Sequence, residues 1–331
     1  MSMSSSNTVP EAAPVTAQAE DTATRPFFWS VKRELWEHSS LYYAPLGIAG
    51  LMLFGFVLSL FGIARHADDI RKTMSPDSIP AMIILPYDVT ALAVIVGSVV
   101  VGLFYCLSAL YNERRERSIL FWKSLPVSNL TTVLSKVFVP LVVLPVIVSS
   151  VVTAMHVIML LLNVIGRTAA GLNVGELIAN VPLFQMEIVL LYGVLTLALW
   201  HAPIYAWFIL VSAWAKKTPI LWAVLPPIAL AVVERVAFNT GYIGRLISYR
   251  IGGALNAAFS EPGHLPMKPL KMSAKAMADA AHHGFQGIPV FGLQQIDLLH
   301  FLATPGLWAG LIVAAAMIAG AIWLRRTGEA L

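Results

Sequence analysis

The chain has 331 residues, of which 58% are hydrophobic and 12% are charged, and its formal net charge is +4 at pH 7. This composition, with a mean hydropathy of +0.75, excludes an ordinary soluble domain and predicts an all-α integral membrane protein. The single cysteine, Cys106, excludes an intrachain disulfide and a cysteine-based metal motif. The surplus of lysine and arginine lies in short loops, which indicates a role in membrane orientation and lipid contact and not in nucleic-acid binding.

The N-terminal residues 1–25 are rich in Ser, Thr, Ala and Pro and contain no apolar signal-peptide core. We therefore expect a disordered tail. Residues 26–39 differ, because Phe28, Val31 and Leu35 share one helical face while charged residues occupy the others. This pattern predicts an N-terminal amphipathic helix in the membrane interface. A plain helical extension of the first span is the alternative interpretation.

Six apolar stretches approach the roughly 20 residues that a bilayer core of about 30 Å requires of a transmembrane helix. They lie near residues 41–63, 88–110, 134–162, 187–212, 219–238 and 303–324. The whole of 26–331 is therefore predicted to form one membrane domain.

Basic residues beside the spans predict the orientation of the chain. The clusters are Lys32 with Arg33, the connector 112–136, Lys216 with Lys217, and Arg325 with Arg326. All fall on one side, which the positive-inside rule makes cytoplasmic. Both termini are then expected in the cytoplasm, with the chain in a bacterial cytoplasmic (inner) membrane and a long extracytoplasmic segment at 241–300.

Polar residues within the spans are few, and four of them are candidates for lining a transport pathway. His156 and His201 lie inside uncharged runs, where each imidazole either makes a helix-to-helix contact or serves as a proton relay. The fifth span, 219–238, contains two adjacent prolines, a pattern that suits a broken helix, and whether the span is continuous or broken stays open. It ends in Glu234 and Arg235, which we place near the outer interface or, alternatively, at the exit of a pathway.

No catalytic motif of a soluble enzyme is present. A phosphate-binding loop of the Gly-x-x-x-x-Gly-Lys-Ser/Thr type is absent, so the chain is not expected to hydrolyse ATP itself, and His-Glu-x-x-His is absent too. His282, His283, Asp297 and His300 lack the helical i, i+4 spacing of metal ligands, and we expect no metal site.

The connector between the second and third spans has a charged start and an apolar end. Arg114, Arg115 and Arg117 are followed by an apolar run that Pro126 stops, and Ser128 is predicted to cap the next helix. The pattern predicts a short cytoplasmic helix with one face suited to a partner.

Three parts of this region carry a resemblance to a known family: the run Glu116-Arg117-Ser118-Ile119-Leu120, the run Leu125-Pro126-Val127-Ser128, and Lys136 at the head of the third span. Together they resemble the hallmark segment of type-2 ABC exporter permeases, with Ser118 where a glycine is usual. The amphipathic N-terminal stretch is similar to the family's interfacial helix. The resemblance implies a six-span permease whose segment between spans 2 and 3 is a cytoplasmic coupling helix.

The same resemblance implies partners and site residues. The chain would pair with a second permease copy, identical or homologous, and with two ABC ATPase subunits that bind ATP and Mg, so this chain itself would hold no cofactor. The implied coupling residues are Glu113, Arg114, Glu116, Arg117, Ile119, Leu120, Phe121, Trp122, Leu125 and Pro126. The arginines could instead contact lipid headgroups.

Two other function classes stay open. An ion-driven secondary transporter would show paired broken helices and acidic groups inside the membrane, and a non-transport membrane assembly factor would show convergent polar residues beside it. Neither pattern is clear in the sequence. The apolar spans favour an apolar or amphipathic cargo, whose identity the sequence does not specify.

Overall fold

The computed structural model describes residues 26–65, 79–115, 128–169, 171, 174–175, 177, 181–260, 263–265, 288–290 and 292–327. Within them, six helices are long and apolar enough to cross a membrane, which confirms the all-α membrane architecture. They are Ser40–Phe61, Ile83–Arg115, Asn129–Ala169, Leu183–Trp214, Pro219–Phe238 and Pro305–Thr327. The predicted tail 1–25 and the middle of the connector, 116–127, lie outside the described residues.

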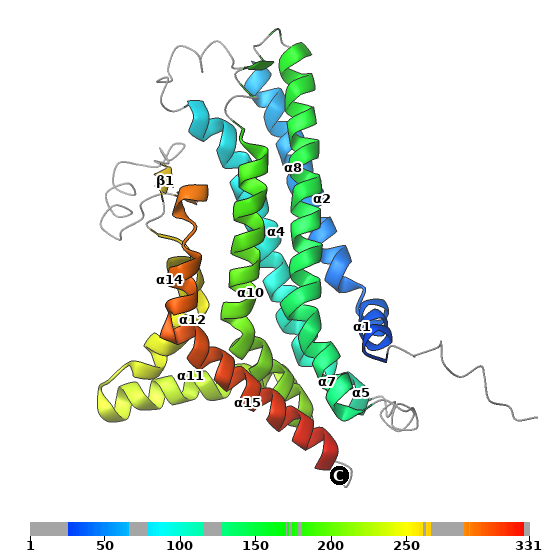
Figure 1. Cartoon of the computed structure of the whole chain (residues 1–331), viewed down its shortest axis with the longest axis vertical. Helices are drawn as coiled ribbons and strands as arrows, with labels where there is room; N and C mark the ends of the chain where they lie inside the picture. Colours follow the sequence, from blue (N-terminus) through cyan, green and yellow to red (C-terminus); the bar gives the residue numbers. More distant parts are fainter. Residues whose placement is uncertain are drawn as a thin grey trace, which may run out of the picture.

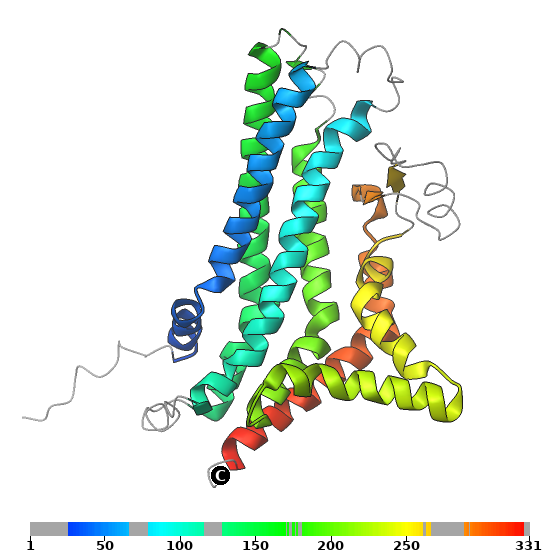
Figure 2. The same ribbon diagram turned by 180° about the vertical axis from the view of Figure 1, so that it is seen from behind.

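The core of the molecule is a bundle formed by four long helices that run side by side (Figures 1 and 2). These helices are α2 (Ser40–Arg65), α4 (Ile79–Ala109), α8 (Leu144–Ala169) and α10 (Leu183–Trp214). Apolar side chains such as Val94, Val152 and Ile209 are fully buried between them, while Leu51 and Phe54 of α2 are exposed. Lipid can cover such an outer face because it is as apolar as the core.

The third span is one rod built from three segments. It begins with α7 (Asn129–Phe138), widens into the π-turn η2 (Val139–Val143) and continues as α8. Pro140 lies inside the π-turn and Pro145 follows it. Because each proline lacks a backbone donor, the helix accommodates the pair by a wider turn. Ser128 Oγ accepts a hydrogen bond of 3.1 Å from the Thr131 amide, which confirms the predicted N-cap.

A short helix, α1 (Pro26–Glu37), lies across one end of the bundle against α7 (Figures 1 and 2). This connector end is where α5 (Tyr111–Arg115) stops and α7 begins. One acidic residue of α1 is buried against the bundle. Phe28 is 56% exposed, whereas Glu34 is fully buried, because polar partners from other helices surround Glu34. Lys32 lies between the exposed rings of Trp29 and Trp36, at 5.0 and 4.8 Å from their centroids.

The fifth apolar stretch forms α11 (Pro219–Phe238), a single helix that runs transverse to α10 (Figures 1 and 2). Of the two possibilities that the sequence left open, the structure has the continuous helix, which runs through Pro226 and Pro227. Two prolines remove local hydrogen bonds, but in an apolar environment the remaining backbone groups are satisfied only if the chain stays helical.

The long segment 241–300, whose structure the sequence did not specify, begins with a helix, α12 (Tyr242–Ala258), which packs against α10. Its Ala254, Ala257 and Ala258 are buried in a cluster with Trp200 and Phe301. The small residues let the two backbones approach closely. Beyond α12, the three-residue strands β1 (Gly263–Leu265) and β2 (Ile288–Val290) pair antiparallel, and η3 (Leu293–Gln295) and α14 (Leu298–Ala303) lead back to the bundle.

The last helix, α15 (Pro305–Thr327), crosses α10 diagonally and ends at the connector end (Figure 1). Its Ala314 is buried with Ala202 and Ala206 of α10. A side chain at Gly310 would collide with the guanidinium of Arg250. The small residues of α15 therefore allow close approach on two sides.

Candidate functional site

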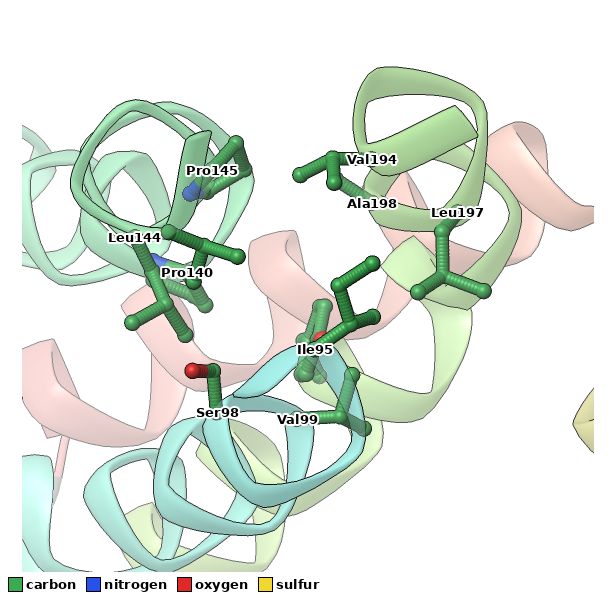
Figure 3. Close-up of a pocket in the computed structure, with 11 residues that line it drawn as sticks. Ile95, Ser98, Val99, Pro140, Leu144, Pro145, Val194, Leu197 and Ala198 are labelled. Atoms are coloured by element: carbon green, nitrogen blue, oxygen red, sulfur yellow. The ribbon is translucent and has the colours of Figure 1, made fainter. Parts of the chain in front are cut away.

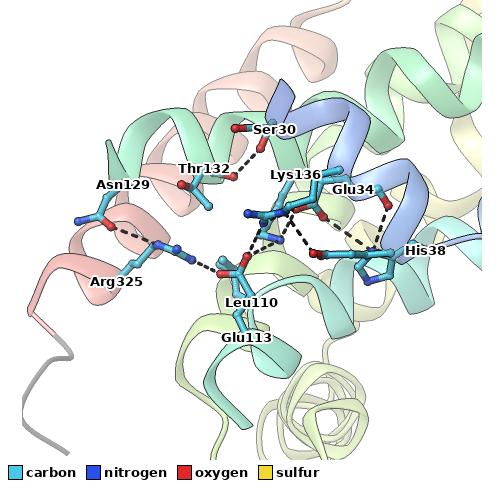
Figure 4. Close-up of polar contacts among 12 residues, drawn as sticks. Ser30, Glu34, His38, Leu110, Glu113, Asn129, Thr132, Lys136 and Arg325 are labelled. Atoms are coloured by element: carbon cyan, nitrogen blue, oxygen red, sulfur yellow. Dashed lines mark hydrogen bonds and ion pairs between the residues drawn. The ribbon is translucent and has the colours of Figure 1, made fainter. Parts of the chain in front are cut away.

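A buried ion-pair cluster lies at the connector end, with Lys136 at its centre (Figure 4). Lys136 Nζ lies 2.7 Å from Glu34 Oε1 and 3.0 Å from Glu113 Oε1. Glu34 and Lys136 have no exposed surface and Glu113 is only 6% exposed. Charges so far from water require partners, and here the partners come from α1, α5 and α7.

Two arginines complete this cluster. Arg33 Nη2 lies 2.9 Å from Glu113 Oε1 and 3.1 Å from Glu34 Oε1. Arg325, near the end of α15, donates from Nη1 to Glu113 Oε2 at 2.5 Å (Figure 4). We call Arg33, Glu34, Glu113, Lys136 and Arg325 the charged hub. It joins α1, α5, α7 and α15 at one point.

Neutral groups hold the hub in place. Tyr105 donates its hydroxyl to Glu34 Oε2 at 3.0 Å, and Arg325 Nε donates to Asn129 Oδ1 at 3.2 Å. Thus Glu34 accepts from a tyrosine as well as from cations. A buried carboxylate satisfied in this way is fixed in position.

Acidic and imidazole groups also meet beside the hub, where Glu34, Glu37 and His38 offer atoms within 4.8 Å of one another. A metal ion does not suit this group, because both Glu34 oxygens already have Lys136 and Tyr105 as partners. Burial raises the pKa of the Glu37 carboxyl and lowers the pKa of the His38 imidazole. These shifts follow from the cost of charging a group away from water.

The predicted coupling residues fall into two sets. Glu113 lies inside the charged hub and does not face outward. Arg114 donates to the carbonyls of Ser212 and Ala215 at 2.6 and 2.8 Å, so it satisfies the C-terminal end of α10. Outside the described residues lie Glu116, Arg117, Ile119, Leu120, Phe121, Trp122, Leu125 and Pro126. The described pair therefore anchors one end of the connector to the bundle.

A second candidate site is a partly open cavity of about 410 Å³ between α4, α10 and α12. Residues of α4, α10 and α12 form most of its wall, and His156 of α8 contributes as well. Both predicted pathway histidines, His156 and His201, line it. The cavity is otherwise mostly apolar, with Leu92, Val96 and Phe259 among its lining residues.

The polar end of the cavity is formed around His156. Its Nδ1 lies 2.8 Å from Glu187 Oε1, and its Nε2 lies 3.2 Å from the Tyr87 carbonyl oxygen. A carbonyl only accepts, so Nε2 is the donor there, and one proton lies between Nδ1 and Glu187. The pair is neutral overall whichever partner holds that proton. Thr153 donates its hydroxyl to the other Glu187 oxygen.

Asp88 also lines this end of the cavity. Its Oδ2 is buried and has no hydrogen-bond partner among the described residues. The predicted spans 88–110 and 187–212 begin at Asp88 and Glu187, and neither acid was named as a candidate site residue from the sequence. The helices begin earlier, at Ile79 and Leu183, which brings both acids into the bundle.

The remaining predicted pathway residues have other surroundings. His201 Nδ1 lies 2.8 Å from the carbonyl of Leu197 in its own helix, so it forms part of the wall. Glu234 accepts from the Tyr242 and Ile243 amides at 2.6 and 2.7 Å and caps the start of α12. Arg235 is exposed. Neither Glu234 nor Arg235 lines the cavity.

A small void of about 20 Å³ adjoins the cavity where α4, α10 and the π-turn meet (Figure 3). Pro140, Leu144 and Pro145 face Ile95 and Val194 across it (Figure 3). The void is large enough for about one water molecule, but its lining is almost entirely apolar. A small gap in the packing therefore lies beside the π-turn.

Comparisons with protein-family models, curated proteins and solved structures give no match for this chain. The fold defines its class: a multi-pass α-helical membrane protein with a buried charged hub at one end and a cavity between its helices.

Proposed function

We propose that the chain is the membrane-spanning permease subunit of an ABC exporter. Its partners are two ATPase subunits, which bind ATP and Mg, and a second permease copy. The observation that carries the proposal is the position of the charged hub. Glu113 lies at the start of the connector 112–136 and Lys136 at its end, and the two side chains meet at 3.0 Å. The hub thereby ties both ends of a coupling-helix-like segment to the bundle.

The mechanism follows from this anchoring. A partner that moves the connector displaces α5 and α7 together, because their charges are paired away from water. The same pairs link α1 through Glu34 and α15 through Arg325. The helices then shift as near-rigid bodies, which alters access to the cavity between α4, α10 and α12. Aromatic residues of the connector, Phe121 and Trp122, supply the contact energy at the ATPase.

The proposed orientation places the connector end in the cytoplasm. Support comes from the basic residues of α1, of α5 and α7 on either side of 116–127, and of the end of α15, because these elements meet at this end (Figure 1). Both termini would then be cytoplasmic, in a bacterial inner membrane, and the cargo would move outward.

Purification from native membranes tests the function. The full chain, tagged and extracted in mild detergent, is expected to co-purify with an ABC ATPase subunit, and the complex is expected to hydrolyse ATP. The matched control is the same chain with Phe121→Ala and Trp122→Ala, which should lose the ATPase while keeping normal membrane abundance. Recovery of the wild-type chain without any ATPase would overturn the proposal.

A second candidate, an ion-driven secondary transporter, is favoured by one observation. Asp88, His156 and Glu187 are ionisable residues inside the bundle, and such residues commonly mark ion pathways. Vesicle transport separates the two functions. An ABC exporter needs ATP and is insensitive to a protonophore, whereas an ion-driven transporter loses activity when the ion gradient collapses.

A further inference from the structure

We propose that the 410 Å³ cavity binds lipophilic cations, molecules with an apolar body and an ammonium group that pairs with Asp88. The inference rests on the proposed transport function, because it names the cargo class of that transporter. Small-molecule sites are typically about 300–1,000 Å³ in volume and are mostly apolar with few polar groups. The cavity fits both criteria.

The apolar wall of the cavity determines the chemical character of the main body of the ligand. Leu92, Val96 and Val100 of α4 line the cavity together with Leu255 and Phe259 of the α12 region. These side chains can gain from contact with a hydrocarbon cage or chain, but they offer no hydrogen bonds. The ligand is therefore apolar over most of its surface.

The charged residue at one end of the cavity determines which polar group the ligand carries. Asp88 is the only acidic residue among those that line the cavity, and its buried Oδ2 has no hydrogen-bond partner among the described residues. His156, the nearby group whose charge acts on Asp88, is also the ion-pair partner of Glu187 at 2.8 Å, so it is shared between two carboxylates. Within the described part of the chain, the Asp88 carboxylate therefore lacks a hydrogen-bond donor at Oδ2 and has no counter-charge of its own. An ammonium group supplies both.

Arg250, a positively charged residue near the cavity, already has binding partners. The guanidinium of Arg250 lies 4.9 Å from the centroid of the Trp200 ring and donates to the Gly306 carbonyl. His201 is bonded to the carbonyl of Leu197. Neither provides a free positive charge for an anionic ligand. The cavity therefore favours cations over neutral analogues, and neutral analogues over anions.

Three adamantane derivatives of matched shape test this order: 1-aminoadamantane, 1-adamantanol and adamantane-1-carboxylate. Binding to the purified full chain in detergent is measured by titration calorimetry, with protein-free detergent subtracted. The wild-type chain is expected to bind the amine at least tenfold more tightly than the alcohol, and the carboxylate more weakly still. An amine that binds no more tightly than the alcohol would overturn the proposal.

Variants then assign the effect to Asp88. Asp88→Asn should lower the affinity for the amine at least tenfold and leave the alcohol almost unchanged. The matched control Asp297→Asn makes the same chemical change at a helix cap away from the cavity and should bind as wild type. Gly252→Leu projects into open space at the cavity wall and should weaken amine and alcohol alike.

Each result has a definite meaning. Full amine selectivity in Asp88→Asn would refute the assignment. If Asp88→Asn does not elute as a folded particle, the amine preference of the wild-type chain and the equal weakening of amine and alcohol binding in Gly252→Leu decide the matter. Failure of amine binding alongside co-purification of an ATPase would reject the cargo class and leave the permease function standing.

Discussion

The ammonium group of Lys136 lies 2.7 Å from the carboxylate of Glu34, and neither side chain is exposed to solvent. The two residues belong to α7 and α1, which are far apart in the sequence. Their pairing turns an interfacial helix into a part of the bundle. It also makes the position of α1 dependent on a residue beside the connector.

Removal of the Lys136 charge should strongly destabilise the folded protein. Lys136→Met removes the fully buried cation that pairs with both Glu34 and Glu113 and leaves Arg33 and Arg325 as their remaining cationic partners. Breaking a buried ion pair in this way costs about 3–5 kcal/mol. The measurement is the free energy of unfolding in detergent. Lys32→Met, which loses only contacts with exposed tryptophan rings, is the control. Equal stability of the two variants would show that the pair contributes little.

A double replacement separates the charge from the packing. Lys136→Met combined with Glu34→Met removes one cation and one anion together, so the penalty of an unpaired charge largely disappears. We expect the double variant to be more stable than Lys136→Met alone. A double variant that is less stable than the single one would contradict this account of the hub.

The proposed orientation predicts a labelling pattern. In a Cys106→Ala background, Ser128→Cys lies at the connector end and Thr168→Cys lies at the opposite end of α8, and both positions are exposed. An impermeant thiol reagent added to intact cells should label only position 168. Labelling of position 128 from outside would reverse the orientation and exclude a cytoplasmic coupling role for the connector.

Docking of the ATPase should depend on the aromatic residues of the connector. Phe121→Ala with Trp122→Ala should weaken retention of the ATPase in pull-down experiments, because interface anchors commonly contribute about 2 kcal/mol or more each. His156→Ala and His201→Ala, which change the cavity, should leave retention unaltered. Arg114→Ala should instead lower stability, because Arg114 caps α10. Wild-type retention by the aromatic double variant would remove the connector as the docking element.

His38 should make stability fall in mild acid. Burial lowers its pKa in the folded protein below the ordinary value of 6.5. The unfolded chain therefore takes up a proton first, and stability is lost as pH falls below 6.5 toward the folded pKa. Glu37, whose pKa burial raises, acts in the opposite direction. Melting temperatures between pH 7.5 and 5 for wild type and His38→Gln isolate the histidine contribution, and identical profiles would contradict it.

The sequence predicted the spans well because hydropathy depends on length and composition alone. The structure confirms six helices of this kind, and it confirms Ser128 as an N-cap because capping is a local interaction. Hydropathy does not specify the direction in which a helix runs relative to its neighbours, however. The fifth stretch has the right length, yet α11 lies transverse to α10 (Figure 2).

The charged hub and the polar end of the cavity could not be predicted, because they depend on contacts between distant segments. Glu34 was placed among the polar residues of an amphipathic helix, and only the approach of Lys136 explains its burial. Asp88 was taken as the edge of a span. A signal was available there in the mostly apolar residues 79–87, which precede Asp88 and belong to the same helix.

The π-turn at Val139–Val143 fixes which face α8 presents to the rest of the bundle. An α-helix turns by about 100° and advances about 1.5 Å per residue, so the extra residue of a wide turn rotates everything that follows by that angle. Lys136 lies before the turn and His156 after it. The π-turn thus sets the rotation of α8 relative to α7. Deletion of Leu141 would leave Lys136 in its ion pairs while turning His156 away from Glu187.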